Sequence, residues 1–309
     1  MDSNVEEFDY FLPFKLASKI IKLLGFWHDE NSSIFYRAFG TVLHLTIIEL
    51  FWVLEIVYLF TIADNVKDMS YILGGIITYT AISFKTLTFV YQLSKIKQLL
   101  KMLEQLHQLT KSEQNYQKIK LKSQVMKIHK VYKMFLFICV LTTVPGVYHL
   151  FLHYNERKFP YKVWIPIDYK SNDFWYWGLA IYFISGPAYG AFIEATLDTF
   201  PVMFICIGTG LLEELRHRMN NIGVEIDNQS GPSHKKLTKF QKVLKQEQTE
   251  KKHLKEFLKC IEIHQAIKQF IVKTSEIFST IIFVQGMCCS INICTTAFQL
   301  SLVSYILIQ

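Results

Sequence analysis

Residues 38–62 read AFGTVLHLTIIELFWVLEIVYLFTI, and this stretch decides the class of fold. Among these residues only Glu49 and Glu55 carry a formal charge. About 20 predominantly apolar residues are enough for an α-helix to cross the hydrocarbon core of a bilayer. Because a backbone in lipid must satisfy its own hydrogen bonds, the stretch predicts a transmembrane helix.

Four more apolar stretches of this kind follow along the chain of 309 residues, at 70–93, 131–153, 174–212 and 274–300. None shows the alternation of apolar and polar residues that the strands of a membrane β-barrel require. We therefore predict an all-α fold, a polytopic transmembrane helical bundle with five spans. Residues 1–309 are expected to form a single membrane bundle, in which the fourth stretch is long enough to extend beyond the bilayer.

Lysine and arginine are concentrated in two of the connections, residues 94–130 and 213–273. The connection after the first span contains only Lys67. The positive-inside rule then places the N-terminus and both basic loops in the cytosol. We expect a multi-pass protein of the plasma membrane, with no glycan at the cytosolic sequons that begin at Asn31 and Asn228.

Both basic loops carry leucine and isoleucine at helical spacing. The first stripe is Ile96, Leu99, Leu100, Leu103, Leu106 and Leu109, and the second is Leu254, Phe257, Leu258, Ile261 and Ile267. This spacing predicts that the spans continue into the cytosol as amphipathic helices that pack together. An additional role in coupling or assembly remains open at this point.

Several polar side chains lie inside the predicted spans, where they are costly and often functional. His44, Glu49 and Glu55 do not share one face of a regular helix. Glu194 and Asp198 do, because they are four residues apart. Their two interpretations are a patch that attracts cations and an acidic pair that faces a wet cavity or is capped by basic residues. Lys85 is expected to extend its ammonium group to the lipid headgroups.

Aromatic residues are frequent in the predicted outer halves of the second, third and fourth spans. An apolar pocket with few polar groups is typical of small-molecule sites, and ordinary packing of a bundle gives the same pattern. The candidate pocket residues are Tyr71, Tyr79, Tyr148, Phe151, Tyr182, Phe183 and Tyr189.

Other classes of function find no support in the sequence. There is no nucleophile elbow, Walker A motif, dinucleotide fingerprint or HExxH motif, so we predict neither an enzyme nor a cofactor. The pairs His149/His153 and Cys260/His264 have a spacing that suits a metal, but no third ligand is evident, and we predict no metal site. The formal net charge of +7 lies in loops between apolar blocks, which argues against nucleic acid as a partner.

Three short motifs, in this order along the chain, resemble the insect odorant receptor family. The first is Phe11-Leu12-Pro13 followed by Leu23-Leu24-Gly25-Phe26-Trp27. The second, between the third and fourth spans, is Pro160-x-x-x-Trp164-x-Pro166. The third is Leu258-x-x-Cys260-Ile261-x-x-His264-x-x-Ile267, before the fifth span. Cys260, His264, Trp164 and Pro166 are thus residues of the family motifs, with a structural or assembly role.

The resemblance implies a subunit of a ligand-gated cation channel that works with an olfactory co-receptor in a hetero-oligomer. It implies a small hydrophobic odorant as the ligand, bound among the outer halves of the middle helices, and membrane lipid around the subunit. Members of the family have seven spans, and the sequence predicts five. We therefore expect that these residues represent the receptor incompletely, and that they give no odorant-evoked current with a co-receptor.

Three alternatives remain. A gustatory receptor of the same superfamily is distinguished from an odorant receptor by a motif in its last span. None of the five predicted spans corresponds to that last span, so the motif does not decide between the two. A G-protein-coupled receptor fragment is disfavoured by the cytosolic N-terminus. A transporter fragment would show internal repeats and paired broken helices, neither of which is evident.

Overall fold

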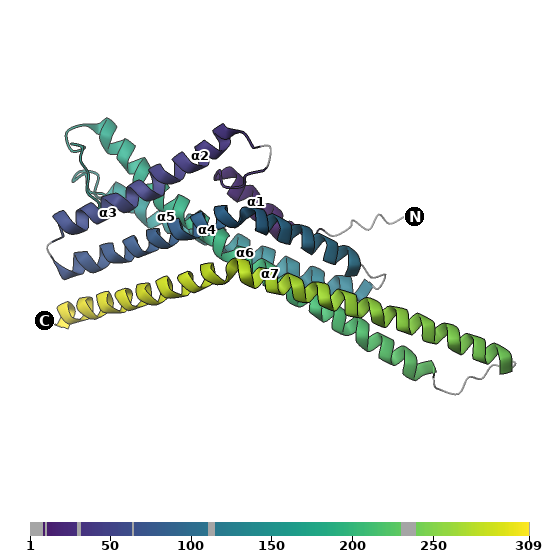
Figure 1. Ribbon diagram of the computed structural model, residues 1–309. Coiled ribbons are helices and arrows are strands. Elements are labelled where there is room, and N and C mark those ends of the chain that lie inside the picture. Colours follow the sequence, from purple (N-terminus) through teal and green to yellow (C-terminus); the bar gives the residue numbers. More distant parts are fainter. Residues whose placement is uncertain are drawn as a thin grey trace, which may run out of the picture. The chain divides into compact units, whose positions relative to one another are not determined.

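The computed structural model describes residues 9, 11–29, 32–63, 65–110, 115–229 and 239–308. Every regular element in these ranges is helical, in the order α1 (Leu12–Leu23), α2 (Ile34–His44), a π-helical turn η1 (Leu45–Glu49), α3 (Leu50–Thr61), α4 (Val66–Thr110), α5 (Asn115–Leu152), α6 (Asp173–Gln229) and α7 (Lys239–Ile308) (Figure 1). The predicted all-α class is confirmed.

Five helical segments are long and apolar enough to cross a membrane: Ile34–Thr61, Asp68–Leu109, Lys122–Leu152, Asp173–Ile222 and Glu247–Ser301. Each contains most or all of one predicted span, so the five predicted spans are confirmed. Pro145 and Pro201, two positions that favour kinks, lie inside helices that continue through them. The apolar window of the fourth segment is the most buried of the five and that of the third is the least buried. The fourth segment is therefore central to the packing.

The chain divides into two compact units. Unit 1 contains residues 1–10, 95–128 and 202–277, and unit 2 contains residues 11–94, 129–201 and 278–309. Helices α4, α5, α6 and α7 each contribute a segment to both units.

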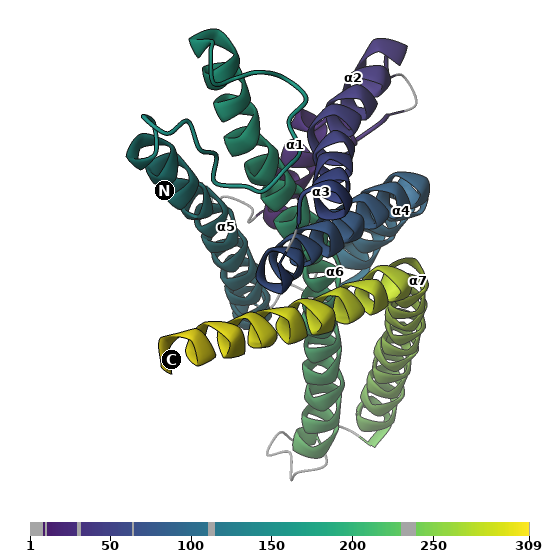
Figure 2. The same cartoon turned by 90° about the vertical axis from the view of Figure 1, so that its left-hand side faces the viewer.

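Unit 1 consists mainly of the two predicted basic loops, whose described residues are helical as expected. Ile96, Leu99, Leu103 and Leu106 of the first predicted stripe are buried and form a packing face, whereas Leu109 is exposed. In unit 1 the lower green segment of α6 and the yellow-green segment of α7 run alongside each other (Figures 1 and 2), and the ring centroids of Phe204 and Phe270 are 6.1 Å apart. Gly208 of α6 faces Phe270, and a Cβ at position 208 would lie 3.4 Å from the ring of Phe270.

The second predicted stripe requires a correction. Only Ile267 of that stripe is buried, whereas Leu254, Phe257, Leu258 and Ile261 are exposed. The face of α7 that packs inside unit 1 consists instead of Cys260, Ile263, Ile267, Phe270 and Thr274. The helix is apolar on two sides in this region, so periodicity identified the helix but did not show which side is covered.

In unit 2, helices α2 and α3 join through η1 into one rod (Figure 1). In a π-helical turn the hydrogen bonds join residues five apart, so residues five apart come to lie above one another. This places Nε2 of His44 3.5 Å from Oε1 of Glu49. A regular helix would separate these two side chains, as the sequence suggested.

Helix α1 belongs to unit 2 and was not predicted from hydropathy, because it is short. It packs through Pro13, Phe14, Ala17 and Ile21. Beyond its end, Gly25 adopts φ +85° and its backbone lies directly against that of Gly40 on α2. Glycine is needed at both positions, since a Cβ on either would collide with backbone atoms. The sequon residue Asn31 lies outside the described residues.

Candidate ligand-binding site

Five aromatic rings meet in unit 2 and are called the Phe51 cluster below. They are Phe51 of α3, Tyr79 of α4, Tyr161 of the α5–α6 loop, and Tyr182 and Phe183 of α6. From the ring of Phe51, which is fully buried, the centroid distances are 4.9 Å to Tyr79, 5.7 Å to Tyr161, 6.3 Å to Tyr182 and 5.8 Å to Phe183. Three helices and a loop thus supply one continuous aromatic surface.

Small residues and backbone contacts hold the cluster together. Gly186 of α6 leaves room for the ring of Phe51, which would lie 3.5 Å from a Cβ at that position. The hydroxyl of Tyr182 donates a hydrogen bond of 2.8 Å to the carbonyl oxygen of Thr46, inside the π-helical turn. The backbone N–H of Trp164 donates to the carbonyl oxygen of Leu54, 3.1 Å away, and so fixes the loop on α3.

The α5–α6 loop continues the aromatic surface. Phe159 lies 4.9 Å from Phe183 and 5.3 Å from Tyr176, measured between ring centroids. Two ion pairs attach the loop to helices: Lys162 pairs with Asp68 of α4, and Arg157 pairs with Asp173 of α6. The loop therefore covers the cluster as an ordered segment.

Burial and nearby polar groups change the pKa of Tyr161 in this loop. Burial, followed by the hydroxyl of Tyr71 and the carboxyl of Glu55, raises the pKa of Tyr161. The phenol therefore stays neutral at physiological pH and is available as a hydrogen-bond donor.

Some buried polar atoms near the cluster have no hydrogen-bond partner in the described part of the chain. They are Oε2 of Glu55 and the hydroxyl of Tyr189. Tyr189 is next to Gly190, where a Cβ would lie 3.8 Å from the ring of Tyr79. Buried polar atoms are normally satisfied, and a few polar groups in an apolar surface are what a small-molecule site uses for orientation.

A second polar group in unit 2 joins α4 to α6. The ammonium nitrogen of Lys85, which is fully buried, lies 3.0 Å from Oε1 of Glu194 and 2.9 Å from Oδ1 of Asp198. The expectation that Lys85 extends to the headgroups was therefore wrong. Its ammonium group binds the two carboxylates instead, because a charge inside an apolar bundle is stabilised most by an opposite charge.

The predicted pocket residues fall into two groups. Tyr79, Tyr182 and Phe183 belong to the Phe51 cluster, and Tyr71 interacts electrostatically with Glu55 beside it. Tyr189 is buried. Tyr148 and Phe151, on α5, have exposed fractions of 64% and 68% and lie outside the cluster.

The residues of the family motifs lie in both units. Trp164 and Pro166 are in the α5–α6 loop of unit 2, where the backbone of Trp164 makes the contact with α3 described above. Cys260 is buried in unit 1, whereas His264, one turn later on α7, is exposed. The rings of His149 and His153 lie 4.5 Å apart, and no group of three potential metal ligands occurs among the described residues.

Sequence reasoning did not include Phe51, Tyr161 or Glu55 among the candidate residues. Phe51 and Glu55 are both in the first span and four residues apart, a spacing that puts them on one face of α3. That spacing was a usable signal. Tyr161 is in an irregular loop, where no periodicity reports which side chains turn inward.

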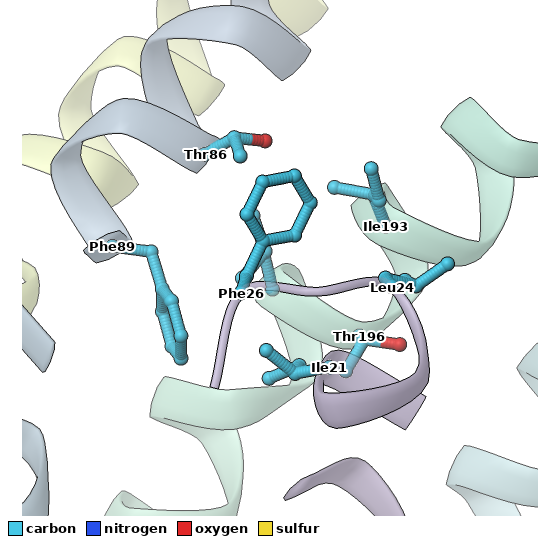
Figure 3. A pocket seen from close by; sticks show the side chains of 8 residues that line it. Ile21, Leu24, Phe26, Thr86, Phe89, Ile193 and Thr196 are labelled. Atoms are coloured by element: carbon cyan, nitrogen blue, oxygen red, sulfur yellow. The ribbon is translucent and has the colours of Figure 1, made fainter. Parts of the chain in front are cut away.

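A small apolar cavity of about 10 Å³ lies elsewhere in unit 2 (Figure 3). The lining residues are Ile21, Leu24, Phe26, Thr86, Phe89, Ile193, Thr196 and Leu197. The two threonine hydroxyls donate to backbone carbonyls of their own helices. The cavity is thus lined by α1, α4, α6 and the segment after α1, and it shares no residue with the Phe51 cluster.

Comparison with known proteins finds similarity in sequence and in fold. The family model described as 7tm Odorant receptor matches residues 65–308. Odorant receptor Or1 of Anopheles gambiae is 22% identical over 298 residues, which cover 93% of this chain and 69% of that protein. The insect olfactory receptor OR5 from Machilis hrabei has a similar solved structure, with a TM-score of 0.64 and 13% identity, over 92% of this chain and 70% of that one.

Proposed function

Because the chain belongs to the insect odorant receptor family, a family of receptors rather than enzymes, we propose that it is an odorant-binding subunit of a ligand-gated cation channel. In this proposal it acts with a co-receptor subunit in the plasma membrane, with its N-terminus in the cytosol. Five apolar helices and the family match make it a multi-pass membrane protein.

The observation that carries the proposal is the Phe51 cluster. Its rings come from three helices and a loop and are accompanied by buried polar atoms without partners. Such a surface suits a small hydrophobic molecule that carries one polar group. Tyr71, which interacts electrostatically with Glu55 and has an exposed fraction of 46%, marks the edge at which a ligand reaches the cluster.

The binding step is tested with the full chain reconstituted in lipid nanodiscs and titrated with volatile alcohols, ketones, esters and amines. Intrinsic tryptophan and tyrosine fluorescence reports saturable binding. The substitution Phe51→Leu keeps an apolar side chain but removes the central ring. It should weaken binding of the best ligand about fivefold, because an aromatic contact contributes about 1 kcal/mol.

Phe60→Leu is the matched control for that experiment. Phe60 lies on the same helix, but its exposed fraction is 82%, so its replacement should leave affinity unchanged. Equal affinity for the wild type and the Phe51→Leu variant would argue against the cluster as the binding site. The absence of saturable binding of every compound would reject the proposal.

A partner surface is available on unit 1. Leu254, Phe257, Leu258 and Ile261 form an exposed apolar stripe on α7, and Lys251, Lys252, Lys255 and Lys259 flank it. An exposed apolar stripe between charged residues is typical of a protein–protein contact. The stripe supports assembly with the co-receptor, and it overlaps the family motif of Cys260 and His264, since Leu258 and Ile261 belong to both.

A further inference from the structure

Glu55 is a buried carboxyl group beside the Phe51 cluster. It lies on α3, one helical turn after Phe51, and only 5% of the residue is exposed. Its carboxyl group faces α4 at Gly75, where a methyl group would lie 2.6 Å from Oε1 and 2.8 Å from Oε2. The absence of a side chain at Gly75 therefore creates the space that the carboxyl group occupies.

No cation of the described residues pairs with this carboxyl group. Oε2 has no hydrogen-bond partner among them. Lys162, in the loop that covers the cluster, is already paired with Asp68, and Lys85 is paired with Glu194 and Asp198. An unpaired carboxylate costs several kcal/mol in an apolar interior, so a carboxyl group without a cation stays in its neutral form. Ionisable residues within membrane spans usually have a functional partner. A neutral amine that reached Glu55 would take up its proton, and the resulting ammonium and carboxylate groups would stabilise each other.

Tyrosines surround the carboxyl group. Tyr71, Tyr79 and Tyr161 each interact electrostatically with Glu55, and they come from two positions on α4 and from the loop. The ring of Phe51 lies 4.9 Å from Tyr79 and 5.7 Å from Tyr161. Aromatic rings attract a cation, so a carboxyl group among aromatic side chains is a suitable place for an ammonium group.

We propose that Glu55 and its tyrosines bind the ammonium group of amine ligands, so that this receptor selects volatile organic amines over uncharged odorants of the same carbon skeleton. The inference rests on the proposed function, because it assigns a ligand class to the same site. The apolar part of the amine lies against Phe51, Tyr182 and Phe183, while the nitrogen donates hydrogen bonds to the Glu55 carboxylate. Tyr71, at the exposed edge, lies where the amine enters.

Two probes that differ only in the polar group test this inference: 2-phenylethylamine and 2-phenylethanol. Both are titrated into the full chain in nanodiscs, and binding is followed by intrinsic fluorescence. The wild type should bind the amine at least tenfold more tightly than the alcohol. The isosteric substitution Glu55→Gln should remove this preference, chiefly by weakening amine binding, and should leave the affinity for the alcohol within about twofold.

Glu156→Gln is the matched control, since Glu156 is an exposed carboxylate of the α5–α6 loop that pairs with Lys158. It should retain the preference for the amine. Thermal unfolding of each variant shows that the proteins compared are folded. The comparison of the two probes on the wild type remains decisive even if Glu55→Gln fails to fold.

Equal binding of the two probes by the wild type, tighter binding of the alcohol, or an undiminished preference in the Glu55→Gln variant would overturn the inference. Saturable binding of the alcohol that is weakened by Phe51→Leu, together with amine binding that is no tighter than alcohol binding, would support the proposed function and reject only the amine. Failure of both probes, together with the whole odorant panel, would reject both.

Discussion

At the scale of single residues, the structure shows how α4 and α6 accommodate charge inside an apolar bundle. Lys85 lies between Glu194 and Asp198, which are one helical turn apart, so its ammonium group contacts both carboxylates. The sequence identified the acidic pair and the lysine separately. It did not connect them, because they are more than 100 residues apart and nothing local reports which helices are neighbours.

The substitution Lys85→Met should destabilise the protein by about 3 kcal/mol, because it leaves two carboxylates near each other without a cation. Chemical unfolding of the full chain in detergent measures the loss. The triple substitution Lys85→Met, Glu194→Gln and Asp198→Asn should recover most of it, since no buried charge remains. A single variant as stable as the wild type would show that the two ion pairs do not contribute to folding.

Glu55 and Phe51 show the same limit of sequence reasoning at the candidate site. Their spacing of four residues, which can be read from the sequence, places both on one face of α3. That the face meets Gly75 and Tyr79 of α4 and Tyr161 of the loop depends on how the helices pack. Conversely, Tyr148 and Phe151 are of residue types that are typical of a pocket, but their side chains are exposed on α5.

At the scale of elements, hydropathy and helical spacing predicted the spans and their continuation into the basic loops. Two features were beyond that reasoning. The π-helical turn Leu45–Glu49 changes the register of the first span and brings His44 to Glu49. On α7 the apolar residues occupy two faces, and only contact with α6 decides that Ile263 and Phe270 are covered while Leu258 is not.

The exposed stripe on α7 gives a prediction about assembly. Leu258→Lys places a charge in the stripe and should reduce co-purification of the full chain with a co-receptor subunit at least fivefold. The side chain of Leu258 is 56% exposed, so the folded chain itself should be little affected. Thermal unfolding of the purified subunit checks that expectation.

Leu258→Met is the control for that experiment, because it keeps the stripe apolar and should co-purify as the wild type does. If Leu258→Lys co-purified to the same extent as the control, the stripe would not be the contact with the co-receptor.

At the scale of the whole molecule, the all-α class, the five spans and the family were predictable because each depends on local composition or short motifs. The binding site was predictable only in part, since Tyr79, Tyr182 and Phe183 come together while Tyr148 and Phe151 do not. The α5–α6 loop accounts for much of the site that could not be predicted. Ion pairs and one backbone hydrogen bond, which no sequence periodicity reveals, hold this loop where Tyr161 and Phe159 join the aromatic surface.

The central claim, that an odorant binds at the Phe51 cluster, is tested most directly by photoaffinity labelling. A bound odorant is replaced by an analogue that carries a small diazirine group, and the labelled full chain is digested and mapped by mass spectrometry. We predict labels on the peptides that contain Phe51, Tyr79 and Tyr182, and loss of these labels when the parent odorant is in excess. Competed labels confined to the cavity lined by Ile21 and Phe89, or to the exposed side of α5 around Tyr148, would contradict the claim.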